Sequence, residues 1–419
     1  MTRARGSAAI AACLATVLLS ACGSSPSQRN DAPPRNAPVT LDFFQFKSEA
    51  VGTFDKLIAG FEARHPGIKV NQHHVPEPDT AIRARLVKDN VPDVITLNGN
   101  STFGELASAG VFYDFAREKA LDNVTPGVRK VLSDLGTASE GEINGLPLAS
   151  NASVVIYNKE LFAKYGVEVP RTWNELVSAA KTFKKAGVTP FYGSLKDAWT
   201  SLPALNQLAA NIPPRDFWQD RRAGRTSFGK EYPEVAHKLA DIYRYTQKDT
   251  FSRDYNAGNR DFAKGAAAMY VQGSAALPPI KSFKPKFGLG TFPLPAGNDP
   301  GATRLVSGVD VALTMGRHPE HPKESLEFIN YLMRPEVVSA YAEEQSAIPP
   351  LKGTAPSDPA LKPLLPYVTR GRITGFPDHQ IPLAVKLEAV TQQFLIDGRR
   401  TAYLRTLDSE YTKVLGRRS

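Results

Sequence analysis

The stretch Leu41–Val75, LDFFQFKSEAVGTFDKLIAGFEARHPGIKVNQHHV, decides the fold class of this chain. It opens with an apolar run, Leu41–Phe46, that is typical of a buried strand. Apolar residues then recur at the i, i+3, i+4, i+7 spacing of one helix face: Phe54, Leu57, Ile58 and Phe61. Pro66 and Gly67 end the helix, because proline cannot continue it and glycine accepts the turn. Extended character resumes after Gly67, so the stretch predicts a βαβ unit.

The rest of the chain repeats this alternation of strands and helices. A helix from Asp79 to Lys88 precedes the strand Val94–Leu97, and the short strand Val154–Tyr157 precedes a helix that opens with a capping box. In that box Thr172 and Glu175 have the spacing at which each caps the other's backbone. The last third is more helical, with periodic stretches at 322–332, 336–345 and 383–394. The pattern predicts an α/β doubly wound sheet, in which ligands lie beyond the carboxyl ends of the strands.

The amino-terminal segment predicts export. Two arginines, Arg3 and Arg5, precede a short apolar run that ends in Leu-Ser-Ala-Cys22, the pattern of a lipoprotein signal peptide over residues 1–21. Cleavage before Cys22 would free its thiol and amine for acylation. Residues 22–38 are rich in Ser, Pro, Asn and Gln, which predicts a disordered tether. The alternative is that the apolar run forms a core helix, but this leaves the cysteine and the tether unexplained.

Composition favours an exported globular protein. The formal net charge of +9 is modest for 419 residues, and no block of five or six basic residues occurs, which argues against a nucleic-acid partner. The two cysteines fall in the signal and at Cys22, so the mature body has no thiol for a disulfide or a cysteine metal site. A body of this length exceeds the size at which one core usually keeps growing, so two lobes are expected.

Six short stretches carry a resemblance to a known family. They are Phe61–Val70, Pro92–Ile95, Gly145–Phe162, Val169–Leu176, Phe262–Met269 and Ala347–Pro350. In this order and behind a lipobox, they resemble the family 1 extracellular solute-binding proteins of ABC importers, a group that includes maltodextrin- and raffinose-type receptors. The resemblance covers nearly the whole mature chain.

The resemblance implies a two-lobed periplasmic-binding-protein-like fold of type II, in which each lobe is a doubly wound sheet and a cleft lies between the lobes. Lobe one would hold residues 39–149 plus 289–314, and lobe two residues 150–288 plus 315–419. It also implies a monomer without cofactor or catalytic activity, anchored by lipid on Cys22 to the extracytoplasmic face of the cell membrane. Its partners would be a mono- to trisaccharide or related glycoside and the transmembrane subunits of an ABC permease.

The first candidate ligand-binding residues are polar side chains just beyond strand ends. Lys47, Ser48 and Glu49 follow the first strand, and Asn98 and Asn100 follow Val94–Leu97. Loop residues of these types are often only solvated, but the position after a strand favours a ligand contact.

The resemblance adds candidates from the rest of the chain. Maltodextrin-type members often carry a cleft acid where this chain has Asn151, whose amide suits neutral hydroxyl groups. The other candidates are Asp197, Trp199, Gly273, Ser274, Asp310, Asp378 and His379. Trp199 would stack on a sugar ring or pack within its lobe, Asp310 would accept from sugar hydroxyls or cap a turn, and His379 is a ligand contact or a surface histidine. Alanines follow Ser274 where many relatives carry tryptophan, so one stacking surface is missing or supplied elsewhere.

Two other classes of function stay open. No HExxH, Gly-x-Ser-x-Gly, P-loop or GxGxxG motif occurs, but the carboxylate pair of an exported glycoside-acting enzyme cannot be recognised from sequence because its separation is spatial. A receptor for a non-sugar solute is the other alternative, with glycerol phosphate, a polyol or ferric ion as ligand. Neither a local block of anion-binding residues nor clustered Tyr and His ligands supports it. No metal site is predicted.

Overall fold

The computed structural model describes residues 38–416. The predicted signal peptide and Cys22 lie outside the described residues, as does the predicted tether except for Pro38. Within the described part, no helix combines the length and the apolar character that crossing a bilayer requires.

A mixed nine-stranded sheet runs through residues 38–416 in the order β2-β1-β3-β8-β4-β6-β5, with β7 paired to β4 and β9 paired to β8. The strands are β1 (Val39–Gln45), β2 (Ile68–His74), β3 (Val94–Leu97), β4 (Leu146–Asn158), β5 (Phe191–Tyr192), β6 (Met269–Gly273), β7 (Leu289–Phe292), β8 (Leu305–Thr314) and β9 (Ile373–Thr374). The predicted α/β class is confirmed, and the two expected sheets are joined into one by hydrogen bonds.

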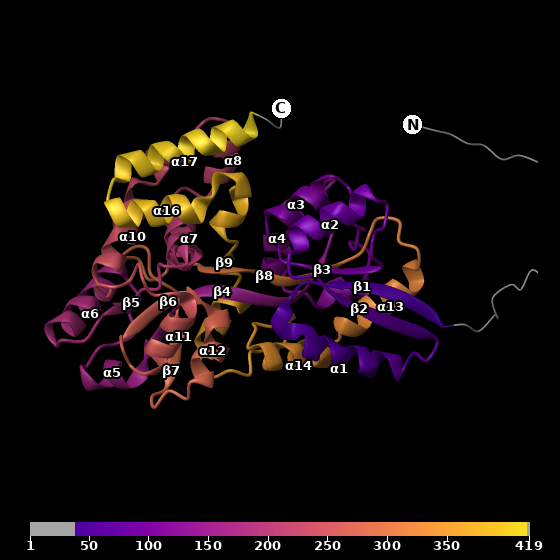
Figure 1. Ribbon diagram of the computed structural model, residues 1–419, viewed down its shortest axis with the longest axis horizontal. Helices are drawn as coiled ribbons and strands as arrows, with labels where there is room; N and C mark the ends of the chain where they lie inside the picture. Colours follow the sequence, from indigo (N-terminus) through magenta and orange to yellow (C-terminus); the bar gives the residue numbers. More distant parts are fainter. Residues whose placement is uncertain (1–37, 417–419) are drawn as a thin grey trace, which may run out of the picture. The chain divides into compact units, whose positions relative to one another are not determined.

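The helices fall into two groups, one around each half of this sheet (Figure 1). Those beside β1–β3 are α1 (Val51–Glu62), α2 (Pro78–Val87), α3 (Ser101–Ser108), α4 (Pro126–Ser133), α13 (Pro322–Leu332) and α14 (Pro335–Gln345). Those beside β5–β7 are α5 (Lys159–Lys164), α6 (Trp173–Lys185), α7 (Leu202–Asn211), α8 (Phe217–Arg222), α9 (Phe228–Glu231), α10 (Pro233–Arg244), α11 (Tyr255–Ala263), α12 (Leu277–Ser282), α15 (Leu365–Thr369), α16 (Leu387–Asp397) and α17 (Arg400–Leu415).

The predicted βαβ unit is present, and the packing of α1 on β1 and β2 stabilises it. β1 pairs in parallel with β2 over seven residues, and α1 covers them with the side chains of its apolar face. Phe43 contacts Phe54 and Phe328 edge-on, with ring centroids 5.2 and 5.4 Å apart. All three rings are fully buried, so this aromatic cluster anchors the first core.

The two longest strands join the halves. β4 and β8 pair antiparallel, with Leu146 opposite Leu313 at one end and Ala152 opposite Ser307 at the other. A register shift falls next to Ala149, which bends the pair where it passes from one core to the other. The amino-terminal part of β4 packs in the cluster of β1, and its carboxyl-terminal part packs in the clusters of β5 and β6.

Two segments pack differently from the predicted division into lobes. α13 and α14, predicted with lobe two, lie in the core of β1, where Phe328 fills the space between Phe43 and Phe61. β7, predicted with lobe one, pairs with β4 beyond its bend, and its Phe292 lies in the other core. We therefore propose a first lobe of residues 38–149 and 309–353 and a second lobe of residues 152–306 and 354–416.

The capping box read from the sequence generates a stability prediction. The Thr172 Oγ1 accepts from the Glu175 backbone N–H at 3.2 Å, and the Glu175 carboxylate accepts from the Thr172 N–H at 3.1 Å. Thr172→Ala should therefore lower the free energy of unfolding of the second lobe by about 1 kcal/mol, measured by urea denaturation. Thr182→Ala is the matched control: Thr182 is exposed in the same helix, and its loss should change stability by less than about 0.5 kcal/mol. Equal effects of the two substitutions would contradict the capping role.

Candidate binding site

A buried ion pair lies where the first half of the sheet meets β8. The Lys47 ammonium, just beyond the end of β1, donates to the Asp310 carboxylate of β8, and the two side chains are only 10% and 11% exposed. Glu49 approaches the same ammonium at 3.6 Å. Burial by itself lowers the pKa of Lys47, but the Asp310 carboxylate, followed by Glu49, raises it further than burial lowers it, so the pKa lies above its ordinary value of 10.5. Lys47 is therefore a fixed positive charge at neutral pH.

Unpaired polar atoms surround this ion pair. The Asn151 side-chain amide donates to Asp310 at 3.4 Å, whereas its Oδ1 is buried and finds no hydrogen-bond partner among the described residues. The same is true of the Ser150 hydroxyl. A buried polar atom without a partner costs free energy, so these groups favour occupation of the site by a ligand that offers hydroxyl donors and acceptors.

These residues line a cavity of about 430 Å³ between the two halves. Its first-lobe wall contains Lys47 and Glu49, and its second-lobe wall contains Tyr255 and Ser274. The Ser274 Oγ accepts from the Ala152 backbone N–H at 3.1 Å, which ties this wall to β4. The cavity thus has walls from both cores and a floor on the paired strands that join them.

Two aromatic side chains flank the second-lobe wall. The rings of Trp199 and Tyr255 are 4.9 Å apart, and Trp199 is 45% exposed, an unusual exposure for an indole. The Asp197 carboxylate accepts from the Tyr255 N–H at 2.8 Å and so positions the ring instead of lining the cavity. Burial, with a smaller contribution from Glu49, raises the pKa of Tyr255, which keeps its phenol protonated. Tyr255 supplies an aromatic surface near the alanines that follow Ser274.

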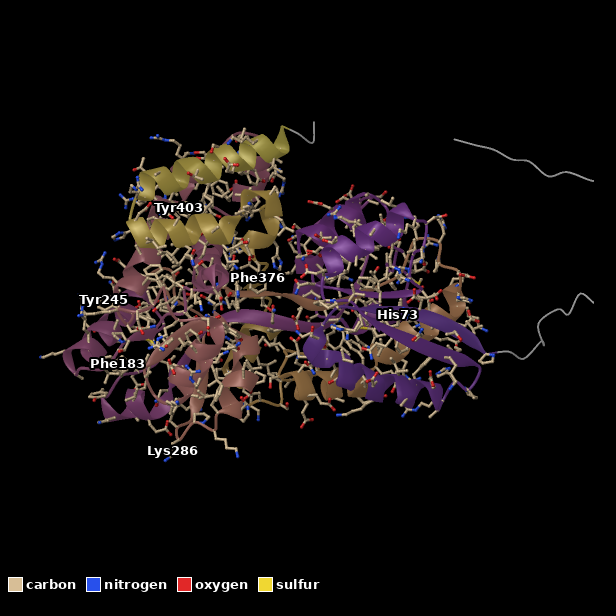
Figure 2. All side chains as sticks on the ribbon, in the orientation of Figure 1. His73, Phe183, Tyr245, Lys286, Phe376 and Tyr403 are labelled. Atoms are coloured by element: carbon tan, nitrogen blue, oxygen red, sulfur yellow. The ribbon has the colours of Figure 1, made fainter. Side chains whose placement is uncertain are left out.

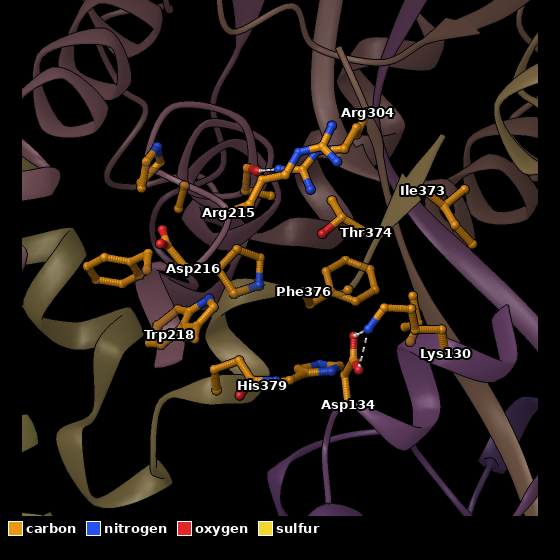
Figure 3. A pocket seen from close by; sticks show the side chains of 18 of the residues that line it. Lys130, Asp134, Arg215, Asp216, Trp218, Arg304, Ile373, Thr374, Phe376 and His379 are labelled. Atoms are coloured by element: carbon orange, nitrogen blue, oxygen red, sulfur yellow. Dashed lines mark hydrogen bonds and ion pairs between the residues drawn. The ribbon is translucent and has the colours of Figure 1, made fainter. Parts of the chain in front are cut away.

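A larger cavity, of about 670 Å³, also lies between the halves (Figure 3). It is bordered by the loop after β3 at Gly99, by α4, and by the segment that contains Phe376 and His379. The rings of Phe376 and His379 are 5.0 Å apart, and His379 Nε2 is 3.9 Å from the Asp378 carboxylate. Asp378 Oδ1, the atom of this contact, is buried and accepts no hydrogen bond from the described residues.

Both cavities have lining residues on or packed against the strand pair of β4 and β8. Asn151 of the smaller cavity stands opposite Gly308 in the register. Phe376 of the larger cavity packs on Gly308 so closely that a Cβ at this glycine would lie 2.4 Å from its ring. Phe376 therefore lies where the two halves of the sheet meet (Figure 2). The absence of a side chain at Gly308 admits Phe376 to the strand pair.

Six of the candidate residues predicted from sequence line the two cavities. The smaller cavity is lined by Lys47, Glu49, Asn151, Ser274 and Asp310, and the larger one by His379. Trp199 lines neither cavity, but its ring contacts Tyr255, which lines the smaller one.

The remaining candidates contact protein groups. Ser48 hydrogen-bonds His74 at 3.1 Å, Asn98 donates to the Asp310 backbone carbonyl at 3.3 Å, and Asn100 caps α3. Gly273 ends β6 opposite Ser153.

Sequence reasoning missed Tyr255, which lines the smaller cavity, and Arg215 and Arg304, which line the larger one. None of these residues directly follows a predicted strand, so the rule that selected Lys47 and Asn98 does not reach them. For Tyr255 the only local signal is Asp254, which caps the start of α11 and fixes the ring just beyond a turn. Among residues 38–416, no three or more His, Cys, Asp or Glu side chains gather as a metal site would require.

A two-lobed α/β scaffold with a polar cavity over the connecting strands defines a solute-binding protein. The profile of the family described as "Bacterial extracellular solute-binding protein" matches residues 47–339. The chain belongs to this family.

Known relatives are similar over most of their length. The multiple sugar-binding protein of Streptococcus mutans is 31% identical over 355 residues, which are 81% of each chain. The ligand-free structure of RafE from Streptococcus pneumoniae is 26% identical with a TM-score of 0.80, over 90% of this chain and 98% of that one. A structure of RafE in complex with raffinose is 25% identical with a TM-score of 0.77, over 90% of this chain and all of that one.

The ion pair generates the second prediction. Lys47→Met or Asp310→Asn alone should lower the free energy of unfolding by about 3 kcal/mol, because each leaves a buried partner unpaired. The double variant should lose less than the sum of the two, which urea denaturation of the four proteins measures. Because the pKa of Lys47 is raised, its contribution is present below pH 10.5 and is lost only as the pH rises through the folded value, so the cycle should give the same coupling at pH 7 and pH 9.

The surface pair Lys130–Asp134 serves as the control. Its side chains are 74% and 54% exposed, so the same cycle there should give a coupling of at most about 0.5 kcal/mol. Additive losses at Lys47 and Asp310 would show that the pair is not coupled.

Proposed function

We propose that this chain captures a saccharide outside the cell and delivers it to the permease of an ABC importer. The observation that carries the proposal is the smaller cavity, in which a charged pair and unpaired buried groups lie beside an exposed indole. Carboxylates and amides exchange hydrogen bonds with sugar hydroxyls, and charge-assisted bonds of this kind contribute about 1.5–3 kcal/mol each. The relatives support the sugar assignment, since they include a multiple sugar-binding protein and a raffinose complex.

The same geometry suggests how capture would signal to a permease. A ligand that touches Lys47 on one side and Ser274 on the other stabilises the arrangement in which the two walls are close. The walls belong to different cores, and the strands between them bend next to Ala149. Closure would then be a hinge motion about β4 and β8, and the closed form is the one that a permease would recognise.

We also propose that the protein is a monomer without catalytic activity. All of the proposed ligand contacts come from side chains of one chain, and none of them requires a nucleophile or a general acid. Incubation of the purified protein with oligosaccharides should leave them intact on chromatography, and hydrolysis would overturn this part of the proposal. Size-exclusion chromatography with light scattering should give the mass of one chain.

The third prediction concerns the ligand. Thermal unfolding of the purified protein should be shifted upward by members of one sugar class in a panel of mono- and oligosaccharides, polyols, glycerol phosphate and metal ions. Ligand at about 100 times its dissociation constant adds roughly 2.7 kcal/mol to the folded state. A shift with iron or a polyol and with no saccharide would retain the receptor and refute the saccharide assignment.

A Trp199 variant tests whether the sugar that raises the unfolding temperature binds beside the smaller cavity. Trp199→Ala should weaken binding of the stabilising sugar by more than about 1 kcal/mol in calorimetric titration, because the exposed indole is available to cover a sugar ring. Phe283→Ala is the matched control, since Phe283 is 47% exposed and, unlike Trp199, packs against no aromatic ring that lines either cavity. Equal affinities for the wild type and Trp199→Ala would remove the indole from the site.

The fourth prediction concerns the anchor, which we propose to be a lipid on Cys22. Cys22→Ala should move the protein from the membrane fraction to the soluble fraction in the native host, because it removes the only acceptor in the lipobox. Cys13→Ala is the control and should leave the protein in the membrane fraction. Membrane retention of the Cys22 variant would exclude acylation at this position.

A further inference from the structure

The larger cavity carries an excess of positive charge. Five cationic side chains line it: Lys130, Arg215, Arg222, Arg304 and Arg372. Only two carboxylates line it, Asp134 and Asp216, and Asp134 already accepts two hydrogen bonds of 2.7 Å from Lys130. The smaller cavity, which suits neutral hydroxyl groups, does not include these cationic side chains.

None of the four arginines in this cavity is in ion-pair contact with a carboxylate of the described residues. Arg304 donates to the Ala210 carbonyl and Arg372 to the Thr303 carbonyl, the latter at 2.6 Å. Arg222 donates to the Gln380 side chain at 3.0 Å. These neutral acceptors hold the guanidinium groups in place and leave their charge unbalanced.

Arg215 and Arg304 come closest to forming an anion site. Figure 3 shows their guanidinium groups next to each other at one end of the cavity. Burial, and after it the positive charge of Arg215, lowers the pKa of Arg304. The two guanidinium charges repel each other, which disfavours the charged form of Arg304. An anion bound between them would favour that charged form and so reverse the lowering of the pKa. Guanidinium groups also match carboxylate and phosphate oxygens in a two-pronged geometry.

Flat side chains occupy the other part of the cavity. Trp218, Phe376 and His379 lie across from the two arginines in Figure 3. The Trp218 ring packs edge-on against Phe217 with centroids 4.9 Å apart, which fixes its orientation. The cavity thus pairs a charged end with apolar ring surfaces, an arrangement that suits a sugar ring bearing an acidic group.

We propose that the larger cavity binds an anionic saccharide, a uronate or a sugar phosphate, with the acidic group held between Arg215 and Arg304. The sugar ring lies toward Trp218 and Phe376. This inference rests on the proposed saccharide-binding function and adds acidic saccharides, bound in the larger cavity, to the ligands of that function. Phosphorylated and carboxylated sugars share the anion that the two arginines recognise.

The test is calorimetric titration of the full-length protein with matched ligand pairs. Each neutral sugar is compared with its uronate and its phosphate: galactose with galacturonate and galactose 1-phosphate, and digalactose with digalacturonate. Inorganic phosphate and sulfate are titrated as anions without a sugar. At least one acidic sugar should bind about tenfold or more tightly than its neutral counterpart, and its affinity should fall as sodium chloride is raised, because Arg215 is exposed to solvent.

Arginine variants locate the effect. Arg215→Gln and Arg304→Gln should each weaken the acidic sugar by about tenfold or more and leave the neutral sugar within about threefold. Arg304→Lys keeps the charge but loses the planar fork, and should fall between wild type and Arg304→Gln. Arg244→Gln is the control, because Arg244 is 67% exposed on α10 and lies outside the cavity. Since Arg215 is exposed, its variant should fold even if Arg304→Gln does not.

The outcomes separate this inference from the proposed function. The inference is overturned if acidic sugars bind no more tightly than neutral ones, or if both arginine variants retain the higher affinity for the acidic sugar. Either outcome leaves the proposed saccharide receptor intact. Binding of inorganic phosphate as tightly as the acidic sugars shows an anion site without sugar recognition and also overturns it. Failure of every sugar, neutral or acidic, overturns both proposals. A gain that is lost in Arg215→Gln supports the inference.

Discussion

The antiparallel pairing of β4 with β8 is the interaction on which the rest of the structure depends. These two strands are the connection through which the nine-stranded sheet continues from one core to the other. Their backbone hydrogen bonds hold the halves in register, while the shift next to Ala149 interrupts that register at a single place. The hydrogen-bonded pairing is therefore regular along most of both strands and is interrupted next to Ala149, where a hinge would bend. Both cavities border this junction, so a ligand in either of them contacts groups from the two cores.

Charge is distributed unevenly around this junction. In the smaller cavity, the Lys47 ammonium balances the Asp310 carboxylate, and the unpaired atoms of Ser150 and Asn151 are neutral. Such a site suits hydroxyl groups, which exchange hydrogen bonds without bringing net charge. In the larger cavity, arginines are held by carbonyl groups and their charge is unbalanced. The two cavities thus differ in the ligands they favour, although Asn151 of the smaller one pairs in register with Gly308, on which Phe376 of the larger one packs.

Local features were predictable from sequence because they depend on neighbours in the chain. The capping box of Thr172 and Glu175 involves residues three positions apart and is present as predicted, whereas the helix predicted to stop at Pro66 already ends at Glu62. Pairings between distant segments were not predictable in this way. Lys47 was selected because it follows a strand, and Asp310 through the family resemblance, but nothing in the spacing shows that they form a pair 263 residues apart. The packing of α13 against β1 also depends on a distant contact, between Phe328 and Phe43.

The sequence by itself determined the α/β class and the family, because periodicity and motif order are properties of contiguous residues, and its amino-terminal segment predicts export. Only the tertiary structure decided which polar groups are buried together, which half of the sheet each late helix covers, and how the charges divide between two cavities. The physical reason is that burial and electrostatic interaction depend on distance in space. Arg215 and Arg304 are unremarkable in sequence, and they become a candidate anion site only because folding places their guanidinium groups side by side.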